Sequence, residues 1–237
     1  MKNIFPRLVM MAGLFSLPFA AMAAGMAVFD STGQPKAGGV RVQVAYPAGF
    51  ESREDPGSDE VRKFTRKSGE LGEVLVLHIM HDVSEKRVKL ALPVDGAVPQ
   101  KERHRLWTEG LAGKNKWLRD IRDTKAHGRP AVFVAGAEIK KKRGKPYYSQ
   151  IEVLTVYDGK NMIILSCMVT GPEEKKAAVD RQYAKSSKTA CQPFLNSLRF
   201  LEPAAVTGPE VIERMDDEIL QMDDGAPGAL CRANSGR

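Results

Sequence analysis

Residues 131–169, AVFVAGAEIKKKRGKPYYSQIEVLTVYDGKNMIILSCMV, decide the fold expected for this chain. They contain three runs rich in β-branched and aromatic residues, at 131–139, 147–157 and 162–169. Such residues favour strands. The segments 140–146 and 158–161 separate the runs, and the second contains Asp-Gly, a strong signal for a tight hairpin turn. The sequence therefore predicts an antiparallel meander of three strands.

Further strands are predicted upstream of the meander. Residues 40–46 alternate between apolar and more polar side chains, which is the period of a strand with one buried face. Residues 61–68 form a second run, and residues 74–80 are apolar on both alternating faces, as in a central strand covered on both sides. Residues 26–29 are a possible edge strand, and residues 84–99 fit neither period well.

The pattern changes to a helical one between residues 100 and 123. Trp107, Leu111, Leu118 and Ile121 recur at spacings of four, seven and three, which predicts one apolar face of a helix. Trp107 lies on that face. Trp117 lies roughly opposite and is therefore a candidate contact residue.

A second helix is predicted after the meander. Residues 170–174, TGPEE, place a proline and two acids in its first turn, where both are favoured. Together, the predicted elements give an α+β fold with an antiparallel sheet flanked by helices.

The N-terminus has the features of a secretory signal peptide. Lys2 and Arg7 precede an uncharged apolar run at 8–21, and Ala21-Met22-Ala23 supplies a cleavage site. The run is short for a permanent anchor, which needs about 20 apolar residues. We predict a signal peptide at 1–23, an N-terminal extension at 24–39, one domain at 40–201 and an acidic tail at 202–237 with a short helix. The expected location is the periplasm, where the protein is soluble after Sec export and cleavage.

Charge is distributed unevenly along the chain. The 237 residues include 36 Lys and Arg and 29 Asp and Glu. Residues 202–237 hold eight acids and three bases, whereas residues 24–201 have an excess of ten bases. The tail could fold back on the basic body, the body could meet an anionic partner, or the charge could serve solubility alone.

Export permits disulfides, and the three cysteines allow at most one internal bridge. Cys167 lies in a predicted strand and Cys191 on the helix that follows, so the two meet if that helix packs back on the sheet. Cys231 would then be left over. It could also pair with either of the others, or between molecules.

Catalytic and metal-binding patterns are absent from the sequence. The serines lie outside any G-x-S-x-G motif, and the Gly-Lys pairs lack the rest of a phosphate-binding loop. His78 and His81 form H-x-x-H in a predicted strand, where residues three apart point to opposite faces. No catalytic, cofactor-binding or metal-binding residue is assigned, and we predict a protein that is not an enzyme.

The sharpest local feature is the basic segment between the first two strands of the meander. It contains Lys140, Lys141, Lys142, Arg143 and Lys145. A solvated turn that discourages aggregation explains it without a function. The alternative is a basic finger that contacts anionic lipid, lipopolysaccharide, a cell-wall polymer or an acidic protein. With Tyr148 and Trp117, these residues form the predicted interaction surface; nucleic acid is not an expected partner of an exported protein.

Three short motifs carry a resemblance to a known family. They are Val40–Phe50, which ends in Tyr-Pro-Ala-Gly-Phe, Gly128-Arg129-Pro130-Ala131, and the closing Phe194–Phe200. With the order of elements, these motifs make residues 40–200 resemble the PsbP/Mog-like α/β/α sandwich, including exported DcrB-like proteins. The resemblance implies an antiparallel sheet with helices on both faces and a role in binding proteins or stabilising assemblies. It carries no catalytic residues. The chain differs from DcrB-like lipoproteins because it lacks a lipobox and has an acidic tail.

The leading hypothesis is a non-enzymatic periplasmic factor that binds another periplasmic protein, either as an accessory or stabilising factor or as an immunity protein that neutralises a toxin. The alternative is an envelope-surface binder that uses the basic hairpin. No cofactor is expected in either case.

Overall fold

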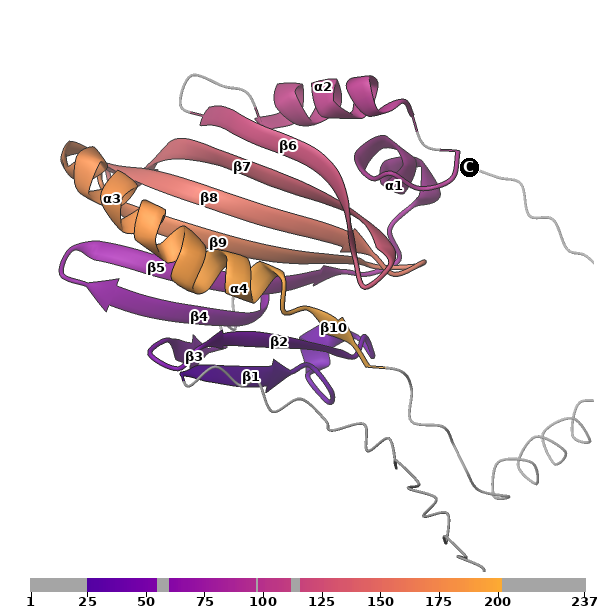
Figure 1. Cartoon of the computed structure of the whole chain (residues 1–237), viewed down its shortest axis with the longest axis horizontal. Coiled ribbons are helices and arrows are strands. Elements are labelled where there is room, and N and C mark those ends of the chain that lie inside the picture. Colours follow the sequence, from indigo (N-terminus) through magenta and orange to yellow (C-terminus); the bar gives the residue numbers. More distant parts are fainter. Residues whose placement is uncertain (1–24, 55–59, 97, 112–115, 202–237) are drawn as a thin grey trace, which may run out of the picture. The chain divides into compact units, whose positions relative to one another are not determined.

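The computed structural model describes residues 25–54, 60–96, 98–111 and 116–201 (Figure 1). Its main sheet has seven strands in the order β3-β4-β5-β9-β8-β7-β6, and every neighbouring pair is antiparallel. The strands are β3 (Glu51–Arg53), β4 (Glu60–Ser68), β5 (Leu71–Met80), β6 (Lys116–Ala126), β7 (Arg129–Lys142), β8 (Lys145–Tyr157) and β9 (Met162–Pro172). The predicted signal peptide, the acidic tail and Cys231 lie outside the described residues.

The predicted meander is present as β7, β8 and β9. β7 and β8 pair continuously from Ala131 with Val156 to Lys142 with Lys145, and β8 pairs with β9 along its length. Arg143 and Gly144 form the tip between β7 and β8, and both have positive φ angles, of 52° and 80°. This is the backbone of a two-residue hairpin turn that matches the twist of the strands.

A second, small sheet contains β1 (Met26–Asp30), β2 (Val42–Pro47) and β10 (Arg199–Phe200), in the order β1-β2-β10. It joins the main sheet through aromatic packing around Phe64 of β4. The Phe64 ring stacks on Tyr46 at 4.1 Å and meets Phe29 and Phe194 edge-on at 5.9 and 6.0 Å between ring centroids. Residues on both sides of the predicted boundary at 40 therefore contribute to one core.

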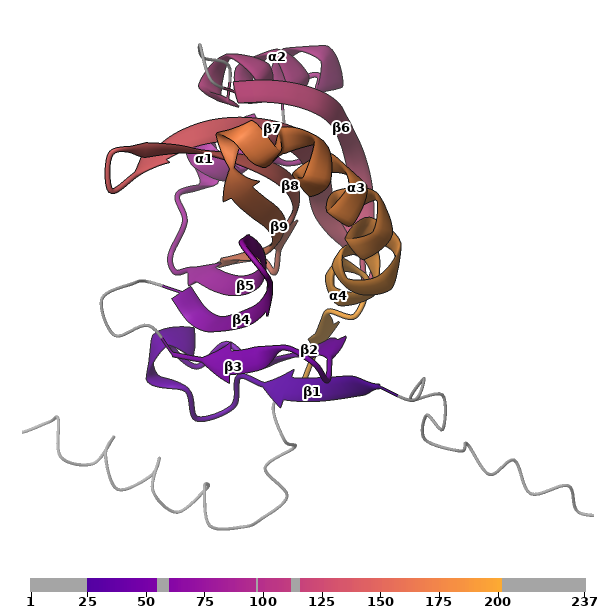
Figure 2. The ribbon, with the colours of Figure 1, turned by 90° about the vertical axis from the view of Figure 1, so that its left-hand side faces the viewer.

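Helices lie against both faces of the main sheet, as expected for this α+β class (Figure 2). The short turns η1 (Pro35–Ala37) and η2 (Glu173–Lys175) precede β2 and α3 (Lys176–Ser186), and η3 (Ser187–Cys191) joins α3 to α4 (Gln192–Leu195). One face, the α3 face, is covered by α3 and α4, with Val179, Phe194 and Leu195 buried against the strands. The opposite face is covered at one end by α1 (Glu85–Ala91) and α2 (Gln100–Leu111).

The prediction of one helix across residues 100–123 is wrong in its second half. α2 ends at Leu111, and residues from Lys116 onward form strand β6. A β-bulge between Leu118 and Asp120 shifts the register, so that Leu118 pairs with Gly136 and Ile121 with Val134. The bulge thereby places two apolar residues three apart on one face of a strand, a spacing that otherwise indicates a helix.

The ambiguous segment at 84–99 contains helix α1, which buries Val88 and Leu92 against the sheet. Trp107 of α2 donates a hydrogen bond from Nε1 to the Ala91 carbonyl at 2.8 Å, which ties the two helices together. Among the residues described, no helix has the length and apolar composition needed to cross a membrane.

Candidate functional site

The basic segment lies on the tip of the long β7–β8 hairpin. Lys140 is 70% exposed, and its Nζ lies 2.7 Å from a carboxylate oxygen of Glu138 on the same strand. Lys141, Lys142, Arg143 and Lys145 are also exposed. Pairing continues to Lys142 and Lys145, so the strands hold these cations at the end of a regular hairpin.

The alternation of the strands divides the cations between the two faces. Lys140 pairs with Tyr147 and Lys142 with Lys145, on the face that also carries α1 and α2. Lys141 pairs with Pro146 and lies on the α3 face. The hairpin therefore presents positive charge on both sides.

Trp117 lies in strand β6 rather than on a helix, and it is 44% exposed. It pairs with Ala137 of β7 on the α3 face. Lys176 of α3 approaches its ring, with Nζ 5.6 Å from the centroid. Since Lys140 follows Ala137 by three residues at about 3.3 Å each, Trp117 and the basic tip lie roughly 10–17 Å apart along the hairpin. Sequence patterns did not indicate the role of Lys176, because α3 and β6 meet only in the folded chain.

Tyr148 lies beneath this surface and is only 3% exposed, so it is a supporting residue rather than a contact residue. Its ring centroid is 6.5 Å from that of Trp117, and its hydroxyl donates to Asp180 of α3 at 3.0 Å. Burial, followed by the hydrogen bond to the Asp180 carboxylate, raises the pKa of Tyr148 to about 12. Tyr148 therefore remains protonated and connects β8 to α3 under Trp117.

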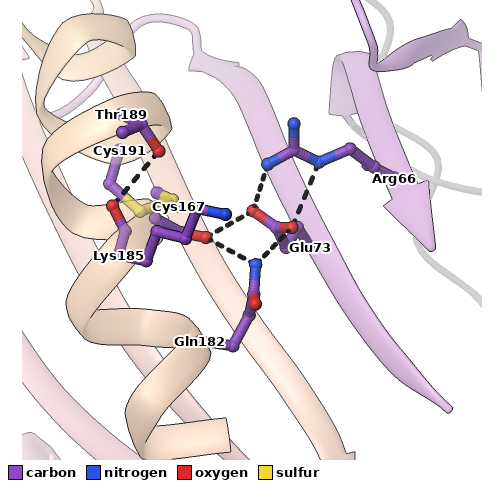
Figure 3. A network of polar contacts seen from close by, with 8 residues as sticks. Arg66, Glu73, Cys167, Gln182, Lys185, Thr189 and Cys191 are labelled. Atoms are coloured by element: carbon purple, nitrogen blue, oxygen red, sulfur yellow. Dashed lines mark hydrogen bonds and ion pairs between the residues drawn. A yellow bond between two sulfur atoms is a disulfide. The ribbon is translucent and has the colours of Figure 1, made fainter. Parts of the chain in front are cut away.

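A buried carboxylate, Glu73, connects β4 and β5 to α3 (Figure 3). Glu73 is 2% exposed and accepts two hydrogen bonds from its cross-strand partner Arg66, from Nε at 3.1 Å and from a terminal nitrogen at 2.8 Å. Gln182 and Ser186 of α3 donate to the same carboxylate at 3.0 and 2.6 Å. These four donors compensate the burial of the charge.

The predicted disulfide between Cys167 and Cys191 is present next to this network (Figure 3). Cys167 belongs to β9 and Cys191 to η3, with Cα atoms 5.3 Å apart. Both residues are buried in the main core. The bridge and Glu73 together fasten the helical layer to the sheet.

Glu152 of β8 is a second buried carboxylate under α3, and it is 2% exposed. Tyr183 and Ser187 both donate to Oε1 at 2.6 Å, whereas Oε2 is buried and has no hydrogen-bond partner among the described residues. Burial, and then the bond to Glu152, raises the pKa of Tyr183 to about 12. Sequence patterns did not indicate this site, because an acid in an alternating strand is expected to face water.

The histidines do not gather into a site within the described residues. His78 lies in β5, while Nε2 of His81 lies 3.2 Å from the Lys36 carbonyl and that of His104 lies 3.3 Å from Asp123. No group of three or more His, Cys, Asp or Glu side chains with metal-binding geometry occurs in these parts of the chain.

A hollow of about 280 Å³ lies between the β6–β7 turn and α4. Arg122, Lys125 and His127 are its ionisable lining residues, over a floor that includes Phe133 and Leu195.

No family model and no curated protein matches the chain. The structure is similar to the solution structure of cyanobacterial PsbP (CyanoP) from Synechocystis sp. PCC 6803, at 9% identity and a TM-score of 0.44, covering 77% of this chain and 96% of that one. It is also similar to the Ran-binding protein Mog1p of Saccharomyces cerevisiae, at 12% identity, a TM-score of 0.43 and coverage of 74% and 95%. LpqN of Mycobacterium tuberculosis, involved in cell envelope biogenesis, is 10% identical with a TM-score of 0.40 and coverage of 73% and 90%. PsbP and Mog1p structures are thus among those similar to this chain, as the sequence resemblance implied; at 9–12% identity and TM-scores of 0.40–0.44, no role follows from the likeness.

Proposed function

We propose that this protein is a periplasmic, non-enzymatic factor that binds another protein. Its contact surface is the hairpin surface, defined here as Trp117, Lys176 and the tip cations Lys140, Lys141, Lys142, Arg143 and Lys145. The partner is a periplasmic protein with an acidic surface. The factor acts either as an accessory or stabilising protein or as an immunity protein that neutralises a toxin.

The observation that carries this proposal is the exposure of Trp117 next to Lys176, on the same hairpin as the tip cations. Trp117 is 44% exposed although its neighbours Ala137 and Tyr148 are buried, so burying it on a partner would remove apolar surface from water. Tryptophan and arginine are common in the centres of protein interfaces. A distance of roughly 10–17 Å between Trp117 and the tip suits a protein surface rather than a small molecule.

A role without catalysis is supported by the use that the fold makes of its buried acids. Glu73 and Glu152 both lie beneath α3 and accept hydrogen bonds from its side chains. Each carboxylate thus holds α3 on the sheet, Glu73 through both of its oxygens and Glu152 through Oε1. The exposed residues of the hairpin surface, in contrast, favour contact with another protein.

Affinity purification from periplasmic extract tests the proposal. The wild-type chain should be exported and should recover a partner in stoichiometric amount, and Trp117→Ala should reduce this recovery without lowering the melting temperature. Leu90→Ala is the matched control, because Leu90 is an exposed apolar residue of α1 on another part of the molecule. Recovery of no partner at native abundance, or equal losses in both variants, would refute the proposal.

The second candidate function is binding of the anionic envelope surface by the hairpin tip. The five cations at the tip favour it, because each Lys or Arg near an anionic membrane contributes about 1 kcal/mol before salt screening. Vesicles containing phosphatidylglycerol, and purified lipopolysaccharide, should then bind the protein in a salt-sensitive manner. Neutralising Lys140, Lys141, Lys142 and Arg143 to Gln should abolish that binding, and unchanged binding would dismiss this function.

A further inference from the structure

Part of the main sheet carries apolar side chains that no described helix covers. The face opposite α3 holds six partly exposed apolar residues on three adjacent strands, and none belongs to a hydrophobic core cluster of the described residues. We call this surface the open strip: Val74, Val76, Ile151, Val153, Ile164 and Met168. The pairing register shows that they are neighbours, since Val74 pairs with Met168 and Met168 with Ile151.

The same face shows how such side chains are normally covered. On β7, next to the open strip, Val132 and Val134 are buried by Val88 and Leu92 of the α1 segment. α1 and α2 lie on this face of the sheet, and α3 and α4 lie on the opposite face (Figure 2). The described helices therefore cover β7 and the ends of β5, β9 and β8 at Met80, Met162 and Tyr157, and they leave the strip farther along these three strands partly exposed.

The dimensions of the open strip fit one helix. Neighbouring strands are about 4.8 Å apart, so three strands span about 10 Å, which matches the diameter of an α-helix. Along the strands, the strip runs from Met168 to Ile164, or about 13 Å at 3.3 Å per residue. A helix rising 1.5 Å per residue covers that length in about nine residues.

A hollow at the edge of the strip provides a place for an anchoring side chain. It has a volume of about 90 Å³, and Ile151 and Val153 of the strip line it together with Leu118 and Val134. Lys116 and Glu138 lie at its rim. An open hollow with mainly apolar walls favours a single large apolar anchor on the incoming surface, which would exclude water from it.

The charges around the strip favour an acidic occupant. Lys63 and Lys67 of β4 pair with Val76 and Gly72, which places them on this face along one flank of the strip. Lys116 lies on the opposite flank, paired with Glu138, and the tip cations Lys140 and Lys142 follow on β7. Glu138 is already bound by Lys140 at 2.7 Å. On the other flank, Lys63 lies 3.3 Å from Glu60. Lysines thus stand on both flanks, two of them beside an acid of this chain.

The same charges disfavour a second copy of this chain as the occupant. In a two-fold symmetric pair, each face meets an identical face. The lysines flanking one strip would then approach the lysines flanking the other. A chain whose residues 24–201 carry a net excess of ten bases also repels itself at long range.

We propose that the open strip binds one amphipathic helix of the partner protein, about three turns long, with an apolar face and acidic flanks. This inference rests on the proposed function as a protein-binding factor and adds to the hairpin surface a second contact with the same partner, on the face opposite Trp117. The apolar face covers Val76 and its neighbours, one large side chain enters the hollow, and the acids meet the lysines on both flanks.

A designed peptide tests the proposal on the full-length mature chain. The probe is a helix of about 14 residues with leucines on one face and glutamates on the other, and its counterpart replaces every glutamate by lysine. The glutamate peptide should bind at least about tenfold more tightly than the lysine peptide. It should also protect β5, β8 and β9 from hydrogen exchange. Equal affinity of the two peptides, or protection elsewhere, would overturn the inference.

Ser166→Glu is the variant of choice, because Ser166 lies in the centre of the strip between Val76 and Val153 and its replacement removes no apolar side chain. It should weaken the glutamate peptide by about tenfold or more through repulsion and steric blockage. Val28→Glu is the matched control, since Val28 is 46% exposed on β1 of the small sheet. An unchanged affinity in Ser166→Glu would refute the site.

Photo-crosslinking in cells separates this inference from the proposed function. With p-benzoylphenylalanine at position 76, the adduct should map to an acidic, amphipathic helical segment of the partner. An adduct to a second copy, or to a basic or extended segment, would overturn the inference. The absence of any adduct while the partner still co-purifies would do the same. Each of these results would leave the proposed function standing. Failure to recover any partner would instead refute the proposed function.

Discussion

The Cys167–Cys191 disulfide should supply a large share of the stability of the fold. The bridge closes a loop with a sequence separation of 24 residues. In the chain-entropy description, a loop of that length lowers the entropy of the unfolded chain by about 11.6 cal/mol/K, or about 3.5 kcal/mol at 25 °C. For a domain of this size, that difference corresponds to a fall of about 10 °C in melting temperature upon reduction.

The experiment compares oxidised and reduced protein in a Cys231→Ser background, which removes the third thiol. Urea unfolding followed by tryptophan fluorescence should give a lower midpoint for the reduced chain, with a free energy of unfolding smaller by about 3.5 kcal/mol. The Cys231→Ser substitution alone should leave the oxidised midpoint unchanged. Peptide mapping should find Cys167 joined to Cys191.

Two results would contradict this reasoning. A loss smaller than about 1 kcal/mol on reduction would mean that the reduced, unfolded chain retains enough structure to cancel the entropic gain. Peptide mapping that joins Cys231 to Cys167 or Cys191 in the unsubstituted protein would show that the bridge between β9 and η3 is not the native one.

Three further predictions concern the interior. Glu73→Ala should lower the free energy of unfolding by about 3 kcal/mol in urea titrations, because it leaves Arg66 and the buried donors of α3 without an acceptor. A loss below about 1 kcal/mol would contradict the importance of these hydrogen bonds. Gly136→Ala should cost about 1–3 kcal/mol by the same assay, since a Cβ at this position would lie 2.6 Å from the Trp117 carbonyl oxygen, and a neutral effect would argue against the close approach of β6. Tyr148 and Tyr183 should ionise at about 12 in ultraviolet titrations, above the ordinary tyrosine pKa of 10. Because the folded chain retains these protons longer than the unfolded chain, their contribution to stability is complete below pH 10 and is lost as the pH rises toward 12; ionisation of all tyrosines at 10 would refute this.

The hairpin surface was only partly predictable from the sequence. The run of cations between two strand patterns indicated an exposed turn, and the structure places it at the tip of β7 and β8. Tyr148 was expected at the surface, but it is buried because the alternation of β8 directs it under α3. Lys176 joined the surface only when α3 packed beside Trp117. Local patterns predict exposure at a turn, whereas the face that each strand residue occupies depends on which elements cover the sheet.

Local patterns in the sequence were enough to predict the meander and the helix after it, because alternation and tight turns act over short distances. They left the pairing of the three cysteines open. The folded chain was needed to show that Cys167 meets Cys191, that residues from Lys116 form a bulged strand, and that Glu73 and Glu152 lie buried under α3. It also decided that the open strip remains partly exposed. Each of these features depends on contacts between elements. The bulge in β6 depends on its pairing with β7, and the burial of Glu73 depends on donors from α3, more than a hundred residues away. The exposure of the open strip depends on how far α1 and α2 extend over the sheet.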